Sequence, residues 1–372
     1  MEYDVHSERY QRQVMLKELG ESGQQKLRSA KVFVAGAGGL GCPALQYLAA
    51  AGVGTIGIID HDIVSLSNLH RQVLFTTADV GVPKVSAAAV RLADMNPGIE
   101  IITYAYRLTT QNALEIMECF DVIVDATDNF PTRYLIGDAC VLLGKPLVQG
   151  AVSRYEGQLA VFNCQTDPAK RPVCYRDLFP EPPEAGEIAN CAEAGVLGVL
   201  PGIIGTMQAA EVIKLVTGTG TSLAGKLQTF DMLRNEWFTW DIQPNLRAER
   251  FIPQTRSAFL DTVYETDCAL SDFTEVDPAA FEGLRRERNV TVIDVRERDE
   301  LPPVDGFPHL QIPLSELKRN LDSVKDPIII TVCQSGKRSS EAARLLAEAF
   351  REKTIYSLRG GIAAWKQQHS TQ

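Results

Sequence analysis

Residues 31–41 read KVFVAGAGGLG, a short β-rich run followed at once by a glycine-rich turn. The turn fits the pattern GxGxxG, and an Ala/Leu-rich helical stretch follows it through Ala51. Such glycines permit a tight turn and close approach of a phosphate, to which the helix N-terminus offers free amides. Asp60 closes the next β-rich run, where its carboxylate can accept hydrogen bonds from ribose hydroxyls. Taken alone, this pattern favours an NAD-dependent dehydrogenase.

The rest of the chain repeats the alternation of strands and helices. Further β-rich runs lie at 122–127 and 145–152, with helical stretches such as 84–95 between them. This order predicts an α/β fold with a doubly wound, mostly parallel sheet. From Gln243 the composition becomes polar and proline-containing without periodicity, which indicates a linker. We therefore predict a nucleotide-binding domain over 1–242, a linker over 243–271 and a second small α/β domain over 272–372.

Composition restricts the class of protein. The 372 residues are 45% hydrophobic and 23% charged, with a net charge of −10, so the chain is a poor candidate for binding nucleic acid or an anionic membrane. No signal-peptide pattern opens the sequence, and Pro201, Gln208, Glu211 and Lys214 interrupt its longest apolar stretch. Eight cysteines without a secretory signal indicate reduced thiols, and we expect a cytoplasmic protein.

Polar residues follow the predicted strands in a pattern that hydride transfer does not need. Residues 60–72 read DHDIVSLSNLHRQ, Lys84 opens the next helix, and Asp128 and Asn129 follow the strand at 122–127. Arg71 and Lys84 can neutralise a triphosphate, and Asp128 can hold its Mg²⁺. The alternatives are solvated charge for the two cations and a helix N-cap for Asp128.

Four stretches together resemble the ThiF/MoeB/HesA family, the bacterial relatives of ubiquitin-activating enzymes. They are ERYQRQ (8–13), the segment 36–72, GVPKV (81–85) and DATDN (125–129), and the resemblance covers about 6–240. It implies adenylation, by ATP with Mg²⁺, of the C-terminal glycine carboxylate of a small ubiquitin-fold sulfur carrier ending in Gly-Gly. It also implies a homodimer in which Arg12 is supplied across the interface. The implied nucleotide site consists of Gly36, Gly38, Gly39, Gly41, Asp60, Asp62, Asn68, Arg71, Gln72, Lys84, Asp128 and Asn129.

The family places a reactive cysteine at Cys191, which can form an acyl or disulfide link with the carrier. An inert buried thiol is the alternative there, whereas Cys42, Cys119 and Cys140 lie in apolar stretches and are expected in the core. Many family members also bind structural zinc through two CxxC pairs. Here the first pair reads Cys174-Tyr-Arg-Asp177, and no cysteine lies between Cys191 and Cys268. One thiolate cannot form a tetrahedral site, so we expect no zinc.

The second domain contains a cysteine between a strand and a helix. Thr331-Val-Cys333-Gln334-Ser335-Gly336-Lys337-Arg338-Ser339 follows the strand, and the amides of the loop together with Lys337 and Arg338 favour a thiolate. With IDVRE (293–297) and LRGGIAAW (358–365), the stretch resembles a single rhodanese domain over 272–368, in which Asp294 and Arg296 are structural. The resemblance implies a persulfide on Cys333. A rhodanese that serves only for docking is the alternative, although such domains usually lack the cysteine.

The two resemblances together predict a two-step reaction. The first domain adenylates the carrier, and a Cys333 persulfide, loaded by a cysteine desulfurase or a small sulfur donor, then attacks the acyl carbon. Reductive release involving Cys191 yields a carrier thiocarboxylate. Molybdopterin, thiamine, tRNA thiolation and siderophore pathways all use this architecture. An NAD-dependent oxidoreductase and a non-enzymatic sulfur-relay protein remain as alternatives.

Overall fold

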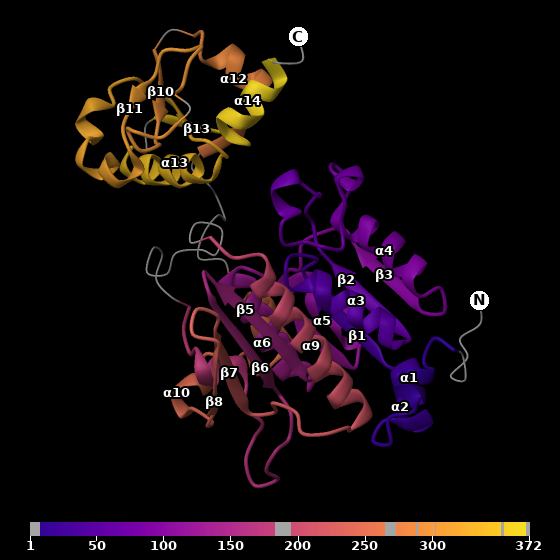
Figure 1. The fold of residues 1–372 in the computed structure, drawn as a ribbon. Helices are drawn as coiled ribbons and strands as arrows, with labels where there is room; N and C mark the ends of the chain where they lie inside the picture. The colour runs from indigo at the N-terminus through magenta and orange to yellow at the C-terminus, as the bar shows by residue number, and fades with distance from the viewer. Residues whose placement is uncertain are drawn as a thin grey trace. The chain divides into compact units, whose positions relative to one another are not determined.

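The computed structural model describes residues 8–182, 195–264 and 273–369, apart from positions 288, 302, 351 and 352. The chain forms two compact units, unit 1 over Met1–Tyr264 and unit 2 over Glu265–Gln372 (Figure 1).

Unit 1 is built on a sheet of eight strands in the order β3-β2-β1-β4-β5-β6-β7-β8. The strands are β1 Lys31–Ala35, β2 Thr55–Ile59, β3 Glu100–Tyr104, β4 Val122–Asp125, β5 Leu147–Ser153, β6 Glu156–Phe162, β7 Lys226–Asp231 and β8 Glu236–Asp241. The five from β3 to β5 are parallel, whereas β5 to β8 pair antiparallel. The predicted mostly parallel sheet is confirmed, and the strand order reverses between β1 and β4.

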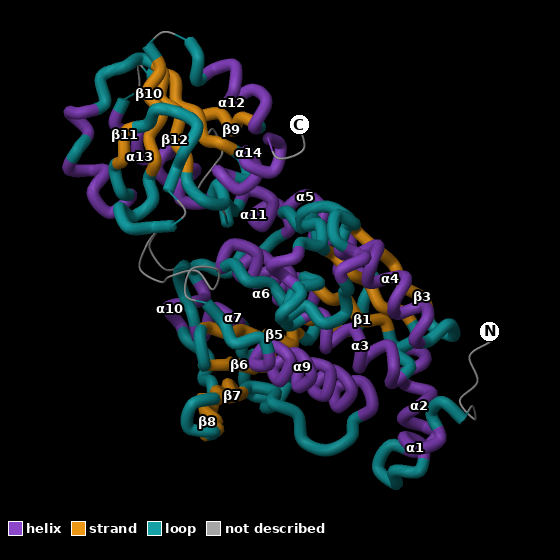
Figure 2. Tube along the Cα trace, turned by 45° about the horizontal axis from the view of Figure 1, so that its top comes forward, coloured by secondary structure: helices purple, strands orange, loops and turns teal. Residues whose placement is uncertain are grey.

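Helices cover both faces of this sheet (Figures 1 and 2). Because side chains alternate along β1, Val32 and Val34 enter one core with α3 and α9, while Phe33 and Ala35 enter another with α5 and α6. The helices are α1 Gln11–Val14, α2 Gly20–Ser29, α3 Gly41–Ala51, α4 Lys84–Met95, α5 Thr110–Glu118, α6 Phe130–Leu143, α7 Tyr175–Leu178 and α9 Val199–Thr217.

Among the described helices, α9 alone has the length and composition of a membrane span. Its residues Leu200, Ile204, Ala209 and Val212 are nevertheless buried in the core that it shares with α3. The helix therefore packs inside unit 1, as the interrupting polar residues predict.

The segment 243–264 belongs to unit 1 and is not part of a linker as predicted. It forms α10 Leu246–Glu249 and α11 Arg256–Asp261, and Phe259 and Tyr264 are buried against α5 and α6. The Tyr264 hydroxyl donates a 2.8 Å hydrogen bond to Asp138 on α6. Helices this short leave no periodic pattern, so the sequence reading missed them. Residues 265–271 of the predicted linker lie outside the described residues.

Unit 2 has a five-stranded parallel sheet in the order β11-β10-β12-β13-β9. Its strands are β9 Phe273–Val276, β10 Val290–Asp294, β11 Leu310–Gln311, β12 Ile328–Val332 and β13 Thr354–Leu358. Neighbouring residues of β12 point to opposite faces, because Ile329 packs with α13 (Lys337–Ala349) and Ile330 packs with α12 (Pro278–Leu284) and α14 (Gly361–His369). The predicted small α/β domain is therefore present.

Candidate functional site

The glycine-rich turn follows β1 and lies against the end of β4. Gly36 has φ +97°, and a Cβ there would lie 2.8 Å from the carbonyl oxygen of Ala126. A Cβ on Gly41 would lie 1.9 Å from the Gly36 carbonyl oxygen. Both positions therefore require glycine. The turn opens at the reversal of strand order, where α/β sheets bind their ligands.

Asp60, at the end of β2, is tied to this turn. Its carboxylate accepts 2.9 Å hydrogen bonds from the backbone amides of Ala37 and Asp62. The buried Lys84 places its Nζ 2.9 Å from Asp62 Oδ2 and 4.0 Å from Asp60 Oδ2. Partial burial opposes ionisation of Asp62, but the hydrogen bond and charge of Lys84 outweigh it and lower the pKa of Asp62. Asp60, Asp62 and Lys84 thus form one charged cluster.

Arg71 and Gln72 also lie beside the glycine-rich turn. A Cβ on Gly39 would lie 3.4 Å from Arg71 Cγ, and a Cβ on Gly38 would lie 3.9 Å from Gln72 Nε2. Gln72 is buried, and its Oε1 has no hydrogen-bond partner among the described residues. An unsatisfied buried acceptor beside a glycine cradle fits a bound polar ligand such as a nucleotide.

Asn68 serves a local structural purpose. Its Oδ1 accepts a 3.2 Å hydrogen bond from the Ser65 amide and caps the 3₁₀ helix Leu66–Asn68.

At the end of β4, Asp128 is exposed and Asn129 is the N-cap of α6. The Asn129 Oδ1 accepts a 3.0 Å hydrogen bond from the Thr132 amide, so the alternative of Asp128 as the cap is wrong. Asp128 therefore remains available to a ligand at this strand end.

Sequence reasoning missed Asp125, the last residue of β4. It is fully buried, its Oδ1 accepts hydrogen bonds from the amide and hydroxyl of Thr127, and its Oδ2 has no partner within the described chain. Burial raises the pKa of this carboxyl. A carboxylate closing an apolar strand is the signal that could have found it.

Arg12 and Cys191 are the remaining predicted site residues of the first unit. Arg12 lies on α1 and is exposed. Cys191 lies outside the described residues. Of the other cysteines, Cys42 and Cys140 are buried as expected, but Cys119 is exposed at the end of α5, so its expected place in the core is wrong.

At the second cysteine position of the first CxxC pair, Asp177 forms an ion pair with Arg171. The buried Asp177 carboxylate accepts two 2.7 Å hydrogen bonds from Arg171 and others from the amides of Cys174 and Asn245. Burial raises the pKa of the Cys174 thiol to about 12. One cysteine thiol beside a carboxylate already bound by arginine does not supply the ligands of a tetrahedral zinc site.

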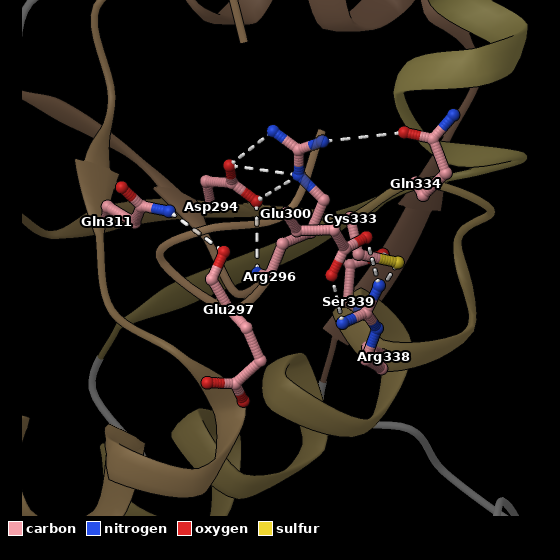
Figure 3. A network of polar contacts seen from close by, with 9 residues as sticks. All are labelled: Asp294, Arg296, Glu297, Glu300, Gln311, Cys333, Gln334, Arg338 and Ser339. Atoms are coloured by element: carbon pink, nitrogen blue, oxygen red, sulfur yellow. Dashed lines mark hydrogen bonds and ion pairs between the residues drawn. The ribbon is translucent and has the colours of Figure 1, made fainter. Parts of the chain in front are cut away.

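In unit 2, Cys333 follows β12, and α13 begins at Lys337 (Figure 3). The backbone amide of Ser339 donates to Cys333 Sγ at 3.3 Å, and the Ser339 Oγ lies 3.6 Å from the sulfur. Gly336 has φ +91°, and a Cβ on Gly361 would lie 2.3 Å from the Cys333 carbonyl oxygen. Two glycines thus let the loop of residues 333–339 close around the sulfur.

Two arginine–carboxylate pairs support this loop (Figure 3). The buried Arg296 pairs with Asp294 at 3.0 Å, which confirms the expected structural pair on the β10 side. Arg338 donates two 2.7 Å hydrogen bonds to Glu300. The hydrogen bonds and charge of Arg338 lower the pKa of Glu300, a residue that sequence reasoning missed.

Comparison with known proteins identifies both units. The ThiF family model matches residues 10–249, and the rhodanese-like domain model matches residues 277–368. A sulfur carrier protein adenylyltransferase of Thermus thermophilus is 52% identical over 65% of this chain and 89% of its own length. The adenylyltransferase and sulfurtransferase MOCS3 of Culex quinquefasciatus is 39% identical over 96% of this chain and 86% of its own length. The probable adenylyltransferase/sulfurtransferase MoeZ of Mycobacterium tuberculosis is 38% identical over 97% and 93%.

The solved structure of E. coli MccB with ATP shares the fold, with a TM-score of 0.56 and 21% identity over 65% of this chain and 73% of that one. These relatives do not support the alternative of an NAD-dependent oxidoreductase. The chain belongs to the ThiF family and carries a C-terminal rhodanese-like domain, and it is an enzyme of the adenylyltransferase and sulfurtransferase type.

Proposed function

We propose that unit 1 uses ATP to adenylate the C-terminal glycine carboxylate of a ubiquitin-fold sulfur carrier ending in Gly-Gly. The observation that carries this proposal is the convergence of the glycine-rich turn, Asp60, Arg71 and Lys84 at the reversal of strand order. Attack of a carboxylate on the α-phosphorus needs alignment and charge neutralisation more than proton transfer. The turn amides and the two cations can supply both.

Asp128 would hold Mg²⁺, which would supply charge neutralisation at the phosphates. An exposed carboxylate at the carboxyl end of β4 suits a hard cation that keeps several waters. Arg12 would complete the site from a second copy of the chain, which makes the active form a homodimer. We propose no zinc, because Asp177 is already bound by Arg171.

Unit 2 would supply the sulfur. A desulfurase or a small donor loads a persulfide on Cys333, and the terminal sulfur attacks the acyl carbon, so that AMP leaves and an acyl disulfide forms. A second thiolate, for which Cys191 is the candidate, then attacks the Cys333 sulfur and releases the carrier thiocarboxylate. The remaining disulfide is reduced by a dithiol. The Ser339 amide, 3.3 Å from Sγ, would stabilise the thiolate in this cycle.

ATP–pyrophosphate exchange with purified carriers tests the proposal. A carrier ending in Gly-Gly should stimulate exchange, and the same carrier without its last glycine should not. Persulfide formation on Cys333 without any carrier-dependent exchange would instead indicate a sulfur-relay protein. The carrier that stimulates exchange identifies the pathway, whether molybdopterin, thiamine, tRNA thiolation or siderophore synthesis.

A further inference from the structure

Arg338, at the start of α13, is held by a carboxylate from another part of unit 2. Glu300 Oε1 and Oε2 accept one 2.7 Å hydrogen bond each from Arg338 Nη2 and Nη1. Two parallel bonds fix the plane of the guanidinium as well as its position. The two side chains are 33% and 26% exposed, so the pair lies where solvent reaches the loop. Figure 3 shows both residues beside Cys333.

The pair reduces the positive potential at Cys333. Of the cationic side chains around the loop, Arg296 is neutralised by Asp294 and Arg338 by Glu300. Lys337 is exposed, and the described residues offer it no ion-pair partner. A small anionic sulfur donor therefore meets less positive charge than the sequence KR after the cysteine indicates.

We propose that Glu300 is a specificity-determining residue of sulfur transfer, because by holding Arg338 it disfavours small dianionic donors such as thiosulfate at Cys333. The inference rests on the proposed role of Cys333 as sulfur acceptor. A donor that presents its persulfide on a protein surface depends less on this local charge, since its affinity comes from a wider interface.

The chemical step explains why this charge matters. The Cys333 thiolate attacks the outer sulfur of thiosulfate, a new S–S bond forms, and the S–S bond of thiosulfate breaks. Sulfite leaves with the bonding electron pair, and cyanide can then remove the outer sulfur as thiocyanate. A dianion must thus approach a thiolate, and a nearby free guanidinium lowers the repulsion between them.

Thiosulfate:cyanide sulfurtransferase kinetics of the full-length wild-type protein and three variants test the proposal. Glu300→Gln leaves Arg338 unpaired and should lower the KM for thiosulfate by about 3- to 10-fold at low salt. Arg338→Gln leaves Glu300 unpaired and should raise this KM. The double variant Glu300→Gln/Arg338→Gln removes both charges, so its KM for thiosulfate should lie between those of the two single variants. The differences should shrink at about 1 M salt, because screening weakens them.

Glu316→Gln is the matched control. Glu316 pairs with Arg298 at 2.9 Å on the surface of the same unit, so the variant removes the same net charge from an exposed pair. Its KM should stay at the wild-type value. An unchanged or increased KM in Glu300→Gln, or an equal decrease in Glu316→Gln, would overturn the proposal.

A second measurement separates this proposal from the proposed function. Alkylation of Cys333 by anionic iodoacetate and by neutral iodoacetamide, followed by peptide mass spectrometry, reports the local potential without turnover. The rate ratio of iodoacetate to iodoacetamide should rise in Glu300→Gln and fall in Arg338→Gln. If the alkylation ratios of the two variants shift as expected but the wild-type protein transfers no sulfur, the proposed role of Cys333 in sulfur transfer is wrong. The effect of Glu300 on the charge at Cys333 would still hold. Normal turnover with unchanged ratios would reject the role of Glu300 alone.

Discussion

Arg171 donates two 2.7 Å hydrogen bonds to the carboxylate of Asp177, whose side chain is fully buried. The same carboxylate accepts a 2.7 Å hydrogen bond from the Asn245 amide. Burial opposes ionisation of Asp177, but these partners lower its pKa. The pair therefore joins α7 to the start of the segment 243–264.

The first prediction concerns this ion pair. Arg171→Gln leaves the Asp177 charge buried with one strong partner removed, and unit 1 should lose about 2–3 kcal/mol of unfolding free energy, since Arg171 is about one third exposed. Urea unfolding measures the loss. Lys170→Gln, which breaks an exposed pair with Asp167, is the control and should cost under about 0.5 kcal/mol.

A chelator should not change the wild-type curve, and about one zinc per chain by elemental analysis would contradict our proposal.

Asp128→Ala should abolish carrier adenylation and leave the melting temperature close to that of the wild type. The Asp128 carboxylate is exposed, and Asn129 is the N-cap of α6. Removing the Asp128 side chain therefore loses neither buried packing contacts nor the helix cap. We expect ATP–pyrophosphate exchange to fall by at least about 100-fold. Asp94→Ala, at an exposed position on α4, should exchange normally. Near-normal exchange in Asp128→Ala would mean that another group holds Mg²⁺.

Sulfur transfer should depend on Cys333, whereas adenylation should not. Alanine has no atom to carry the outer sulfur, so Cys333→Ala should lose thiosulfate sulfurtransferase activity and thiocarboxylate formation together. Its pyrophosphate exchange should persist, because unit 1 has its own core. Full thiocarboxylate yield from this variant, with thiosulfate or a desulfurase as the only sulfur source, would assign the sulfur to another cysteine. Cys191 would then be the first candidate.

Truncation should show where the adenylation unit ends. A chain of residues 1–264 should keep the exchange activity and melting temperature of unit 1. A chain ending near Pro244 loses the buried Phe259 and the hydrogen bond from Tyr264 to Asp138, so it should be less stable by several kcal/mol. Equal melting temperatures for the two chains would show that the segment 245–264 adds nothing to stability.

Acid should weaken unit 2 through Glu282. Burial opposes its ionisation, but hydrogen bonds from Arg285 and Trp365 lower its pKa to about 2 from 4.5. A carboxylate with a lowered pKa stabilises the fold above pH 4.5, and this stability is lost as the pH falls towards 2. Denaturant unfolding should show about 1–2 kcal/mol lost over this window after allowance for solvent screening. Glu282→Gln should remove this part of the pH dependence.

In both candidate sites, the residues that the sequence predicted belong to continuous motifs. The glycine-rich turn follows a strand and opens a helix, and its positive φ and close backbone contacts accept only glycine, so a short pattern specifies it. The loop from Cys333 to Ser339 is equally local, because the amide that contacts the sulfur lies six residues further along the chain. Local geometry of this kind is written in consecutive residues, and the sequence by itself determined it.

The tertiary structure decided which charges face each other. Glu300 and Arg338 are 38 residues apart, and Asp138 and Tyr264 are 126 residues apart. No periodicity or spacing in the sequence links the two residues of such a pair, because only the packing of distant strands and helices brings them together. Because such partners are not visible in the sequence, the cations after Cys333 were expected to be unpaired, and the segment from Gln243 was expected to be a linker. In the folded chain, Glu300 instead pairs with Arg338, and Tyr264 donates a hydrogen bond to Asp138 on α6. A buried polar group is stable only where the fold supplies its partner.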